Sequence, residues 1–228
     1  MEIYEALYTT RAMRRLKPDP IPYEVQARIL DAAIRAPNIG EGWRFLLVDD
    51  PAIKARFAPL YRQGFERMVG GKPEEVFADV LQADTALGRT VRSGLYLLEH
   101  FAEVPLFLIG FARTREGSGI YPALQNARLA ARAEGVGSTL TGFLQTSFAD
   151  EVMELLGVPK GEGWHMHGVV PLGYPRGKWG VGARKPVHEV AARNSWEGDL
   201  GFTVPEPLWP KGVGACEEQI TSKGRASS

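Results

Sequence analysis

The chain has 228 residues, 44% of them hydrophobic and 24% charged, and its 27 lysines and arginines balance 27 aspartates and glutamates. This composition is that of a globular protein with a sizeable core, and it excludes a global attraction to nucleic acid or to an anionic membrane. No apolar run reaches the roughly 20 residues of a membrane span, and the start lacks the features of a secretory signal. The one cysteine, Cys216, excludes an intrachain disulfide, so we expect a cytoplasmic protein.

Helical and strand patterns follow one another along the chain, but without the strict alternation of a doubly wound sheet. The predicted helices are 1–10, 22–36, 51–69, 74–102, 121–134 and 149–157. The predicted strands are 43–48, 105–112, 138–143 and 164–175, the first of them apolar enough to be covered on both faces. We therefore expect an α+β fold in which helices sandwich a mixed β-sheet.

After residue 174 the chain becomes rich in glycine, proline, tryptophan and charge, with no clear period. We expect one domain over 1–215, with an extension from about residue 186, and a disordered tail over 216–228. The extension has no compact core of its own. It therefore wraps either its own subunit or a partner subunit, and we favour the partner.

Arginines are concentrated near the start of the chain. Arg11, Arg14 and Arg15 fall within five positions, just before the extended stretch "KPDPIP". A solvated turn and a clamp for one anion both explain this cluster, because two converging guanidinium groups present planar forks of donors to a phosphate. A nucleic-acid surface is the weakest of the three readings, since the rest of the chain supplies no basic excess.

The glycine-rich stretch "GVGSTLTG" does not have the spacing of a dinucleotide-binding loop, and it leads from a helix into a strand. It is either a tight helix-to-strand turn or a loop whose backbone N–H groups, beside Ser138, Thr139 and Thr141, bind a flat polar ligand. His165 and His167 have a metal-capable spacing on one side of a strand, but no third ligand is evident. We predict no metal site.

Four stretches, taken together and in order, resemble the nitroreductase family of FMN-dependent oxidoreductases. They are "TTRAMRRLKPDPIP", "APNIGEGWRFLLV", "YPALQNARLAARAEGVGSTLTGF" and "VVPLGYPRGKWGVGARKPVHEV". The resemblance implies an intertwined homodimer with FMN at the subunit interface. It also implies hydride transfer from NADPH or NADH, followed by reduction of a nitroaromatic, a quinone or an activated alkene at the same flavin face in a ping-pong mechanism.

The resemblance also assigns residues to the cofactor. Arg11 and Arg14 would hold the FMN phosphate and the pyrimidine edge of the flavin, and Arg184 would add a second phosphate contact. No side chain receives a catalytic role, because flavin N5 carries the hydride. The cofactor-binding residues implied in this way are Arg11, Ala12, Arg14, Arg15, Pro37, Asn38, Ile39, Glu41, Gln125, Ser138, Thr139, Leu140, Thr141 and Arg184.

Two positions depart from the family pattern. Ala12 stands where a serine is usual, and the loop "PNIGEGW" is shorter than usual, with Glu41 in place of a glutamine. A carboxylate at the reacting edge would repel the negative charge that builds up on reduced flavin. The departures leave two alternatives open: a flavin-binding or flavin-sequestering protein with weak turnover, and a family variant with specialised flavin or dehalogenation chemistry whose lid is 62–95.

Replacing Glu41 by glutamine is therefore expected to raise the flavin midpoint potential and to speed turnover with NAD(P)H. Potentiometry and steady-state kinetics on the purified variant check this. If both quantities equal those of the unsubstituted protein, Glu41 does not slow the reaction.

Overall fold

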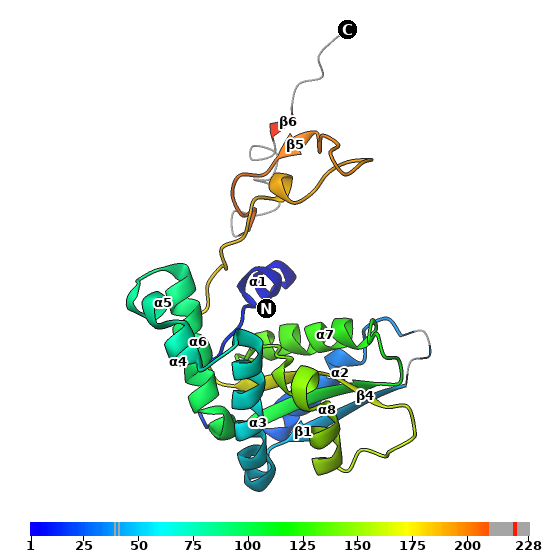
Figure 1. The fold of residues 1–228 in the computed structure, drawn as a ribbon. Helices are drawn as coiled ribbons and strands as arrows, with labels where there is room; N and C mark the ends of the chain where they lie inside the picture. The colour runs from blue at the N-terminus through cyan, green and yellow to red at the C-terminus, as the bar shows by residue number, and fades with distance from the viewer. Residues whose placement is uncertain (39, 41, 210–220, 223–228) are drawn as a thin grey trace. The chain divides into compact units, whose positions relative to one another are not determined.

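The computed structural model describes residues 1–38, 40, 42–209 and 221–222 (Figure 1). Two compact units divide the chain: a core unit, Arg11–Lys178, and a terminal unit made of Met1–Thr10 and the segment from Trp179 onward. The prediction of a single domain over 1–215 with an extension from about residue 186 stays a prediction. Within the described ranges, no helix is both long enough and apolar enough to cross a lipid bilayer.

The core unit is built on a four-stranded sheet in the order β1-β2-β4-β3, in which every neighbouring pair is antiparallel. The strands are β1 Trp43–Val48, β2 Leu106–Ala112, β3 Gly137–Ser138 and β4 His165–Gly173. β2 and β4 form the fully paired centre, and nearly all of their side chains are buried. The expectation that β1 is covered on both faces holds only in part: Trp43, Phe45 and Leu47 are partly buried against the core, while on the other face Val48 is buried and Arg44 is exposed.

One face of the sheet packs against α2, Tyr23–Ala33, and α7, Ile120–Ala133. The prolines before α2 keep the chain extended, and Pro22 lies at the N-cap rather than inside the helix. Small residues on α7, including Ala123, Ala127 and Ala131, are fully buried and allow the helix to approach the sheet closely. The sandwich that the sequence predicts is confirmed on this face (Figure 1).

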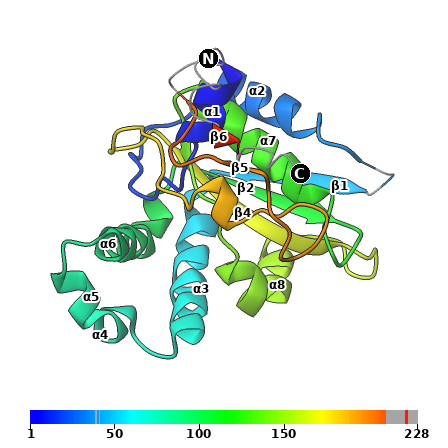
Figure 2. The same cartoon turned by 90° about the horizontal axis from the view of Figure 1, so that it is seen from above.

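The opposite face carries α3, Pro51–Val69, and α8, Phe143–Leu155 (Figure 2). Aromatic rings join these layers. Phe57 of α3 packs edge-on against Phe107 of β2, with ring centroids 6.1 Å apart. The Phe107 centroid lies 4.7 Å from that of Phe101, which begins the 3-10 helix η1, Phe101–Glu103. All three side chains are fully buried and form the second half of the core.

The long helix predicted over 74–102 is wrong. The segment folds as three helices beside α3: α4 Pro73–Val76, α5 Ala78–Gln82 and α6 Ala86–Glu99 (Figures 1 and 2). Ala83 is extended, and Thr85 caps α6 by accepting a hydrogen bond from the backbone N–H of Gly88 at 3.0 Å. This capping bond begins a new helix and overrides the continuous helical period.

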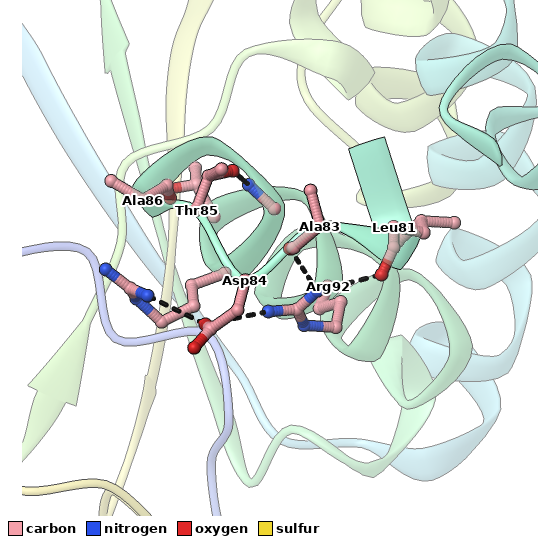
Figure 3. Close-up of polar contacts among 9 residues, drawn as sticks. Leu81, Ala83, Asp84, Thr85, Ala86 and Arg92 are labelled. Carbon is pink, nitrogen blue, oxygen red and sulfur yellow. Dashed lines mark hydrogen bonds and ion pairs between the residues drawn. The ribbon is translucent and has the colours of Figure 1, made fainter. Parts of the chain in front are cut away.

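Arg92 fixes the corner between α5 and α6 (Figure 3). Its Nη1 donates to the carbonyl oxygen of Leu81, in the last turn of α5, at 2.9 Å and to that of the C-cap residue Ala83 at 3.1 Å. Asp84 accepts from Arg89 at 2.9 Å and lies 3.9 Å from Arg92 Nη2. The corner is therefore held by one guanidinium that satisfies carbonyls the short helix leaves open.

The strand predicted over 138–143 is also wrong beyond its first residue. β3 covers only Gly137–Ser138, Thr141 forms an isolated bridge with Val169, and α8 already begins at Phe143. The predicted helix over 149–157 is the second part of α8, which has a non-helical residue at Phe148. The short β3 leaves residues 139–142 as an irregular segment at the edge of the sheet.

In the terminal unit, Glu2 caps α1, Ile3–Thr9, through its carboxylate, which accepts from the N–H groups of Tyr4 and Glu5. A 3-10 helix, η2 Val187–Glu189, precedes a small antiparallel pair, β5 Phe202–Thr203 and β6 Thr221–Ser222. The other residues of the predicted tail over 216–228 lie outside the described residues, as does Cys216.

Candidate functional site

The arginine segment and the 138–142 segment lie side by side in the core unit. Ala12 forms a parallel bridge with Ser138, and the N–H of Met13 donates to the carbonyl of Ser138 at 2.8 Å. Ser138, Thr139 and Thr141 are buried. The arginine segment and the 138–142 segment, which are more than a hundred residues apart in the sequence, are thus joined by backbone pairing.

A pocket of about 250 Å³ opens where Arg14 meets this segment, and we call it the Arg14 pocket. Residues from α3, from α6 and from the junction of α4 and α5 form its other walls. The residues that line it are Arg14, Tyr61, Phe65, Phe77, Thr90, Val91, Gly94, Thr139, Leu140, Thr141, Gly142 and Phe143. The stretch 62–95 therefore contributes aromatic and aliphatic walls to a pocket that contains several of the predicted site residues.

Arg14 is the one charged side chain of this lining. It is half-buried, and burial lowers the pKa of its guanidinium. Within residues 1–38, 40, 42–209 and 221–222, no group accepts a hydrogen bond from it or forms an ion pair with it. An arginine remains charged even so, and a desolvated cation without an acceptor is an unfavourable arrangement unless an anion or acceptor atom binds there.

Two hydroxyl groups lie beside Arg14. The side chain of Thr141 donates to the phenol oxygen of Tyr61 at 3.3 Å, and the Tyr61 ring stacks on Phe101 with a centroid distance of 3.8 Å and an interplanar angle of 12°. Burial raises the pKa of the Tyr61 phenol, which the neighbouring hydroxyl and the Arg14 charge only partly offset. The phenol is therefore a neutral donor at physiological pH.

Arg11 and Arg15 are placed differently from Arg14. Both are exposed; Arg11 donates to the carbonyl of Lys178 at 3.1 Å, and the Arg15 guanidinium lies 5.3 Å from the centre of the Tyr96 ring. Neither lines the Arg14 pocket. The predicted convergence of Arg11 and Arg14 on one point is not shown within the described core unit.

The α7 helix presents an exposed Gln125 whose side-chain oxygen accepts from Arg128 Nη1 at 2.8 Å. The Nε of Arg128 is buried, and none of the described residues accepts a hydrogen bond from it. Burial also lowers the pKa of this guanidinium. The sequence prediction included Gln125 but missed Arg128, although the spacing of three residues on a helix places both on one face.

The remaining predicted residues lie apart from the Arg14 pocket or outside the description. Pro37 and Asn38 are exposed after α2, while Ile39 and Glu41 lie outside the described residues. Arg184 belongs to the terminal unit, where it lines a pocket of about 220 Å³ with Leu7, Tyr8, Thr10 and Gly182. Its role as a phosphate ligand stays a prediction.

A sequence model of the nitroreductase family matches residues 7–174, which contain the strands and helices of the core unit together with the arginine segment. The chain belongs to the nitroreductase family. The match also includes the 138–142 segment, so all residues that line the Arg14 pocket lie within the range that the family model matches.

Solved structures with a similar fold include three at low sequence identity. An iodotyrosine deiodinase bound to FMN and 3-iodo-L-tyrosine is 20% identical, with a TM-score of 0.63 over 86% of this chain and 100% of that chain. A BluB-like flavoprotein from Clostridium difficile 630 is 19% identical, with a TM-score of 0.61, and the match covers 84% of this chain and 98% of that chain. Nitroreductase A from Vibrio parahaemolyticus is 20% identical, with a TM-score of 0.63, and the match covers 86% of this chain and 78% of that chain.

In this nitroreductase-family chain the two candidate histidines are strand residues of β4. His167 is buried, and its Nε2 lies 2.9 Å from the carbonyl oxygen of Thr114. Gly117 has a φ of +61°, and a Cβ there would lie 2.2 Å from the imidazole, so the loop before α7 closes over the ring only because this residue is glycine. Within the described chain, no group of three or more metal-binding side chains is gathered.

Two larger pockets, of about 610 and 420 Å³, flank the loop between α8 and β4 and share Trp164. Arg113 stacks over the Trp164 ring at 4.9 Å and pairs with Glu162 at 3.5 Å. Neither pocket contains a predicted site residue, and Asp150 and Arg44, which line them, are exposed to solvent. The Arg14 pocket is smaller than either, but it contains four of the predicted site residues, Arg14, Thr139, Leu140 and Thr141.

Proposed function

We propose that this chain is an FMN-dependent oxidoreductase that takes hydride from NADPH or NADH and then reduces a nitroaromatic, a quinone or an activated alkene. The observation that carries this proposal is the guanidinium of Arg14, which is half-buried in a pocket without an acceptor. Membership of the nitroreductase family supports the same reading.

The residues of the Arg14 pocket fit such a cofactor in their chemistry. FMN carries a phosphate and a planar ring rich in acceptor atoms, and it would supply the hydride-accepting centre. The pocket offers guanidinium and hydroxyl donors, while Phe65, Phe77 and Phe143 offer apolar surface for a planar group.

One pocket serving both substrates in turn explains why the chain has no separate dinucleotide-binding motif. Leu140, which is 39% exposed, and the other walls of the pocket would orient each substrate and exclude water. Because the Tyr61 phenol keeps its proton, it can stabilise negative charge as a neutral donor. We assign no acid or base among the side chains, and water can supply the proton.

The test is direct. The purified protein is expected to be yellow and to release FMN that chromatography identifies, and stopped-flow mixing with NADPH is expected to bleach the flavin within seconds. A colourless protein that cannot be reconstituted with FMN would remove the basis of the proposal.

A flavin-sequestering protein is the second candidate, and the short loop with Glu41 is the feature that favours it. A yellow protein that is not bleached by NADPH or NADH on a seconds scale would support it over the oxidoreductase. A specialised variant is the third candidate, and its motivation is the similarity in fold to the iodotyrosine deiodinase. Loss of iodide from 3-iodo-L-tyrosine, added to the dithionite-reduced protein, would distinguish that case.

We further propose that the chain acts as a cytoplasmic homodimer in which the extension from about residue 186 covers the partner. Large apolar side chains of this extension are exposed in the single chain: Trp196 at 92%, Val190 at 67% and Val187 at 45%. Light scattering is expected to give twice the chain mass. A monomer at micromolar concentration would contradict the dimer without affecting the FMN proposal.

A further inference from the structure

The Tyr61 and Thr141 hydroxyl groups carry two protons, and their mutual hydrogen bond uses only one of them. With Thr141 as the donor in that bond, the proton of the Tyr61 phenol is not used by it. Apart from the Thr141 oxygen, none of the residues that the structure describes accepts a hydrogen bond from the phenol. Since Tyr61 lines the Arg14 pocket, this free donor belongs to the pocket that also holds the Arg14 guanidinium.

We propose that Tyr61 is a further cofactor-binding residue, whose hydroxyl donates to an acceptor atom of FMN beside Arg14, and that Thr141 positions it. This inference rests on the proposed FMN function. Neither the family match nor the resemblance in sequence assigns Tyr61 any role.

Packing fixes the direction of this donor before any ligand binds. Tyr61 is 4% exposed, and its ring is stacked on Phe101 and lies 5.4 Å from Phe143. Thr141 is fixed by two backbone hydrogen bonds with Val169, of 2.9 and 3.1 Å. A donor that is held in this way loses little entropy on binding, and it does not need to reorganise when charge develops on its acceptor.

The polar groups in this corner select the occupant. Arg14 offers donors and a positive charge, and the Tyr61–Thr141 pair offers one more donor, so the corner attracts an acceptor with negative charge and disfavours a cation. Burial raises the pKa of Tyr61, which keeps the proton on the phenol. In FMN both the phosphate oxygens and the acceptor atoms of the ring have this chemistry, and riboflavin, which lacks the phosphate, distinguishes them.

The test compares Tyr61→Phe with the unsubstituted protein after removal of bound flavin. The variant keeps the ring that stacks on Phe101, so only the hydroxyl is lost. We expect the FMN dissociation constant, measured by fluorescence quenching, to rise about tenfold, as for one hydrogen bond to a charged acceptor. A similar loss with riboflavin places the hydroxyl at the ring, and a loss confined to FMN places it at the phosphate; either result supports the inference.

Thr141→Val is the second variant, because it removes the positioning hydroxyl without changing the volume much. The double variant is expected to bind FMN no more weakly than Tyr61→Phe, since both changes break one coupled unit. Tyr23→Phe is the matched control, because Tyr23 is 81% exposed on α2 and should leave binding unchanged.

The flavin midpoint potential separates a bound donor from a merely structural tyrosine. Suppose that the Tyr61 hydroxyl makes the protein bind reduced FMN tenfold more tightly, relative to oxidised FMN. Its removal in Tyr61→Phe then lowers the two-electron midpoint potential by about 30 mV. Unchanged potential and unchanged affinity in both variants, in a protein that still binds FMN, would overturn this inference alone. Failure of the unsubstituted protein to bind FMN would overturn the proposed function together with it.

Discussion

Replacing Arg14 by alanine is expected to weaken FMN binding at least tenfold. Arg14 is the one cation in the lining of its pocket, and no described residue accepts a hydrogen bond from its guanidinium, so the whole set of donors is available to the cofactor. A hydrogen bond to a charged group contributes about 1.5–3 kcal/mol, which corresponds to a factor of roughly 10 to 150 in the dissociation constant. Fluorescence titration of the flavin-free protein measures this loss.

The same substitution is not expected to destabilise the flavin-free protein. It removes a desolvated charge that has no partner in the described core unit, so the free energy of unfolding should stay constant or increase. With FMN present, a tenfold weaker complex should lose about 1.4 kcal/mol of ligand-induced stabilisation. Thermal unfolding with and without FMN therefore separates a lost ligand contact from a damaged fold.

Arg56→Ala is the matched control for Arg14→Ala, because it removes an equal charge elsewhere in the core unit. Arg56 is exposed on α3 and does not line the pocket, so we expect FMN affinity to change by less than about threefold. Arg11→Ala tests the clamp that the sequence predicts, for which a loss of about tenfold or more is expected. Equal FMN affinity in Arg14→Ala and the unsubstituted protein would show that the pocket does not hold the cofactor.

The sequence predicts the central strands well, because their signal is local. Leu106–Ala112 is an uninterrupted apolar run between Pro105 and Arg113, and both ends of the run are visible without knowledge of the fold. The three-helix break in 74–102 is not visible in the same way. The cap formed by Thr85 competes with a continuous helical period, and which of them prevails depends on the packing of α5 against α6.

The candidate site is only partly accessible from sequence. Arg14 and the 138–142 segment stand out through their residue types, and the bridge between Ala12 and Ser138 brings them together. Tyr61 belongs to no motif, and it reaches the pocket only because α3 packs on α8 and on the sheet. A hydroxyl on one helix that accepts a hydrogen bond from a segment 80 residues away is a property of the tertiary structure, so periodicity and spacing cannot reveal it.

Gly88→Ala is expected to destabilise the corner between α5 and α6 by about 1–3 kcal/mol, as overpacking does in other close contacts. A Cβ at this position would lie 2.4 Å from the carbonyl oxygen of Ala83 and 2.7 Å from that of Val80. Both atoms are backbone, so the clash is relieved only if α5 moves away from α6. That movement would also stretch the two bonds from Arg92 to the carbonyls of Leu81 and Ala83 (Figure 3).

The corner also supports one wall of the Arg14 pocket, so the same substitution is expected to reduce FMN affinity severalfold. Phe77 immediately precedes α5, and Val91 lies on α6 within one turn of Gly88, and both line the pocket. Denaturant unfolding and hydrogen exchange in α5 and α6 measure the local effect. Arg89→Ala serves as the control, because it removes only an exposed ion pair with Asp84 and should cost less than about 1 kcal/mol. If Gly88→Ala matched this control in both stability and FMN affinity, α5 could move away from α6 at no cost, and its position would not shape the pocket.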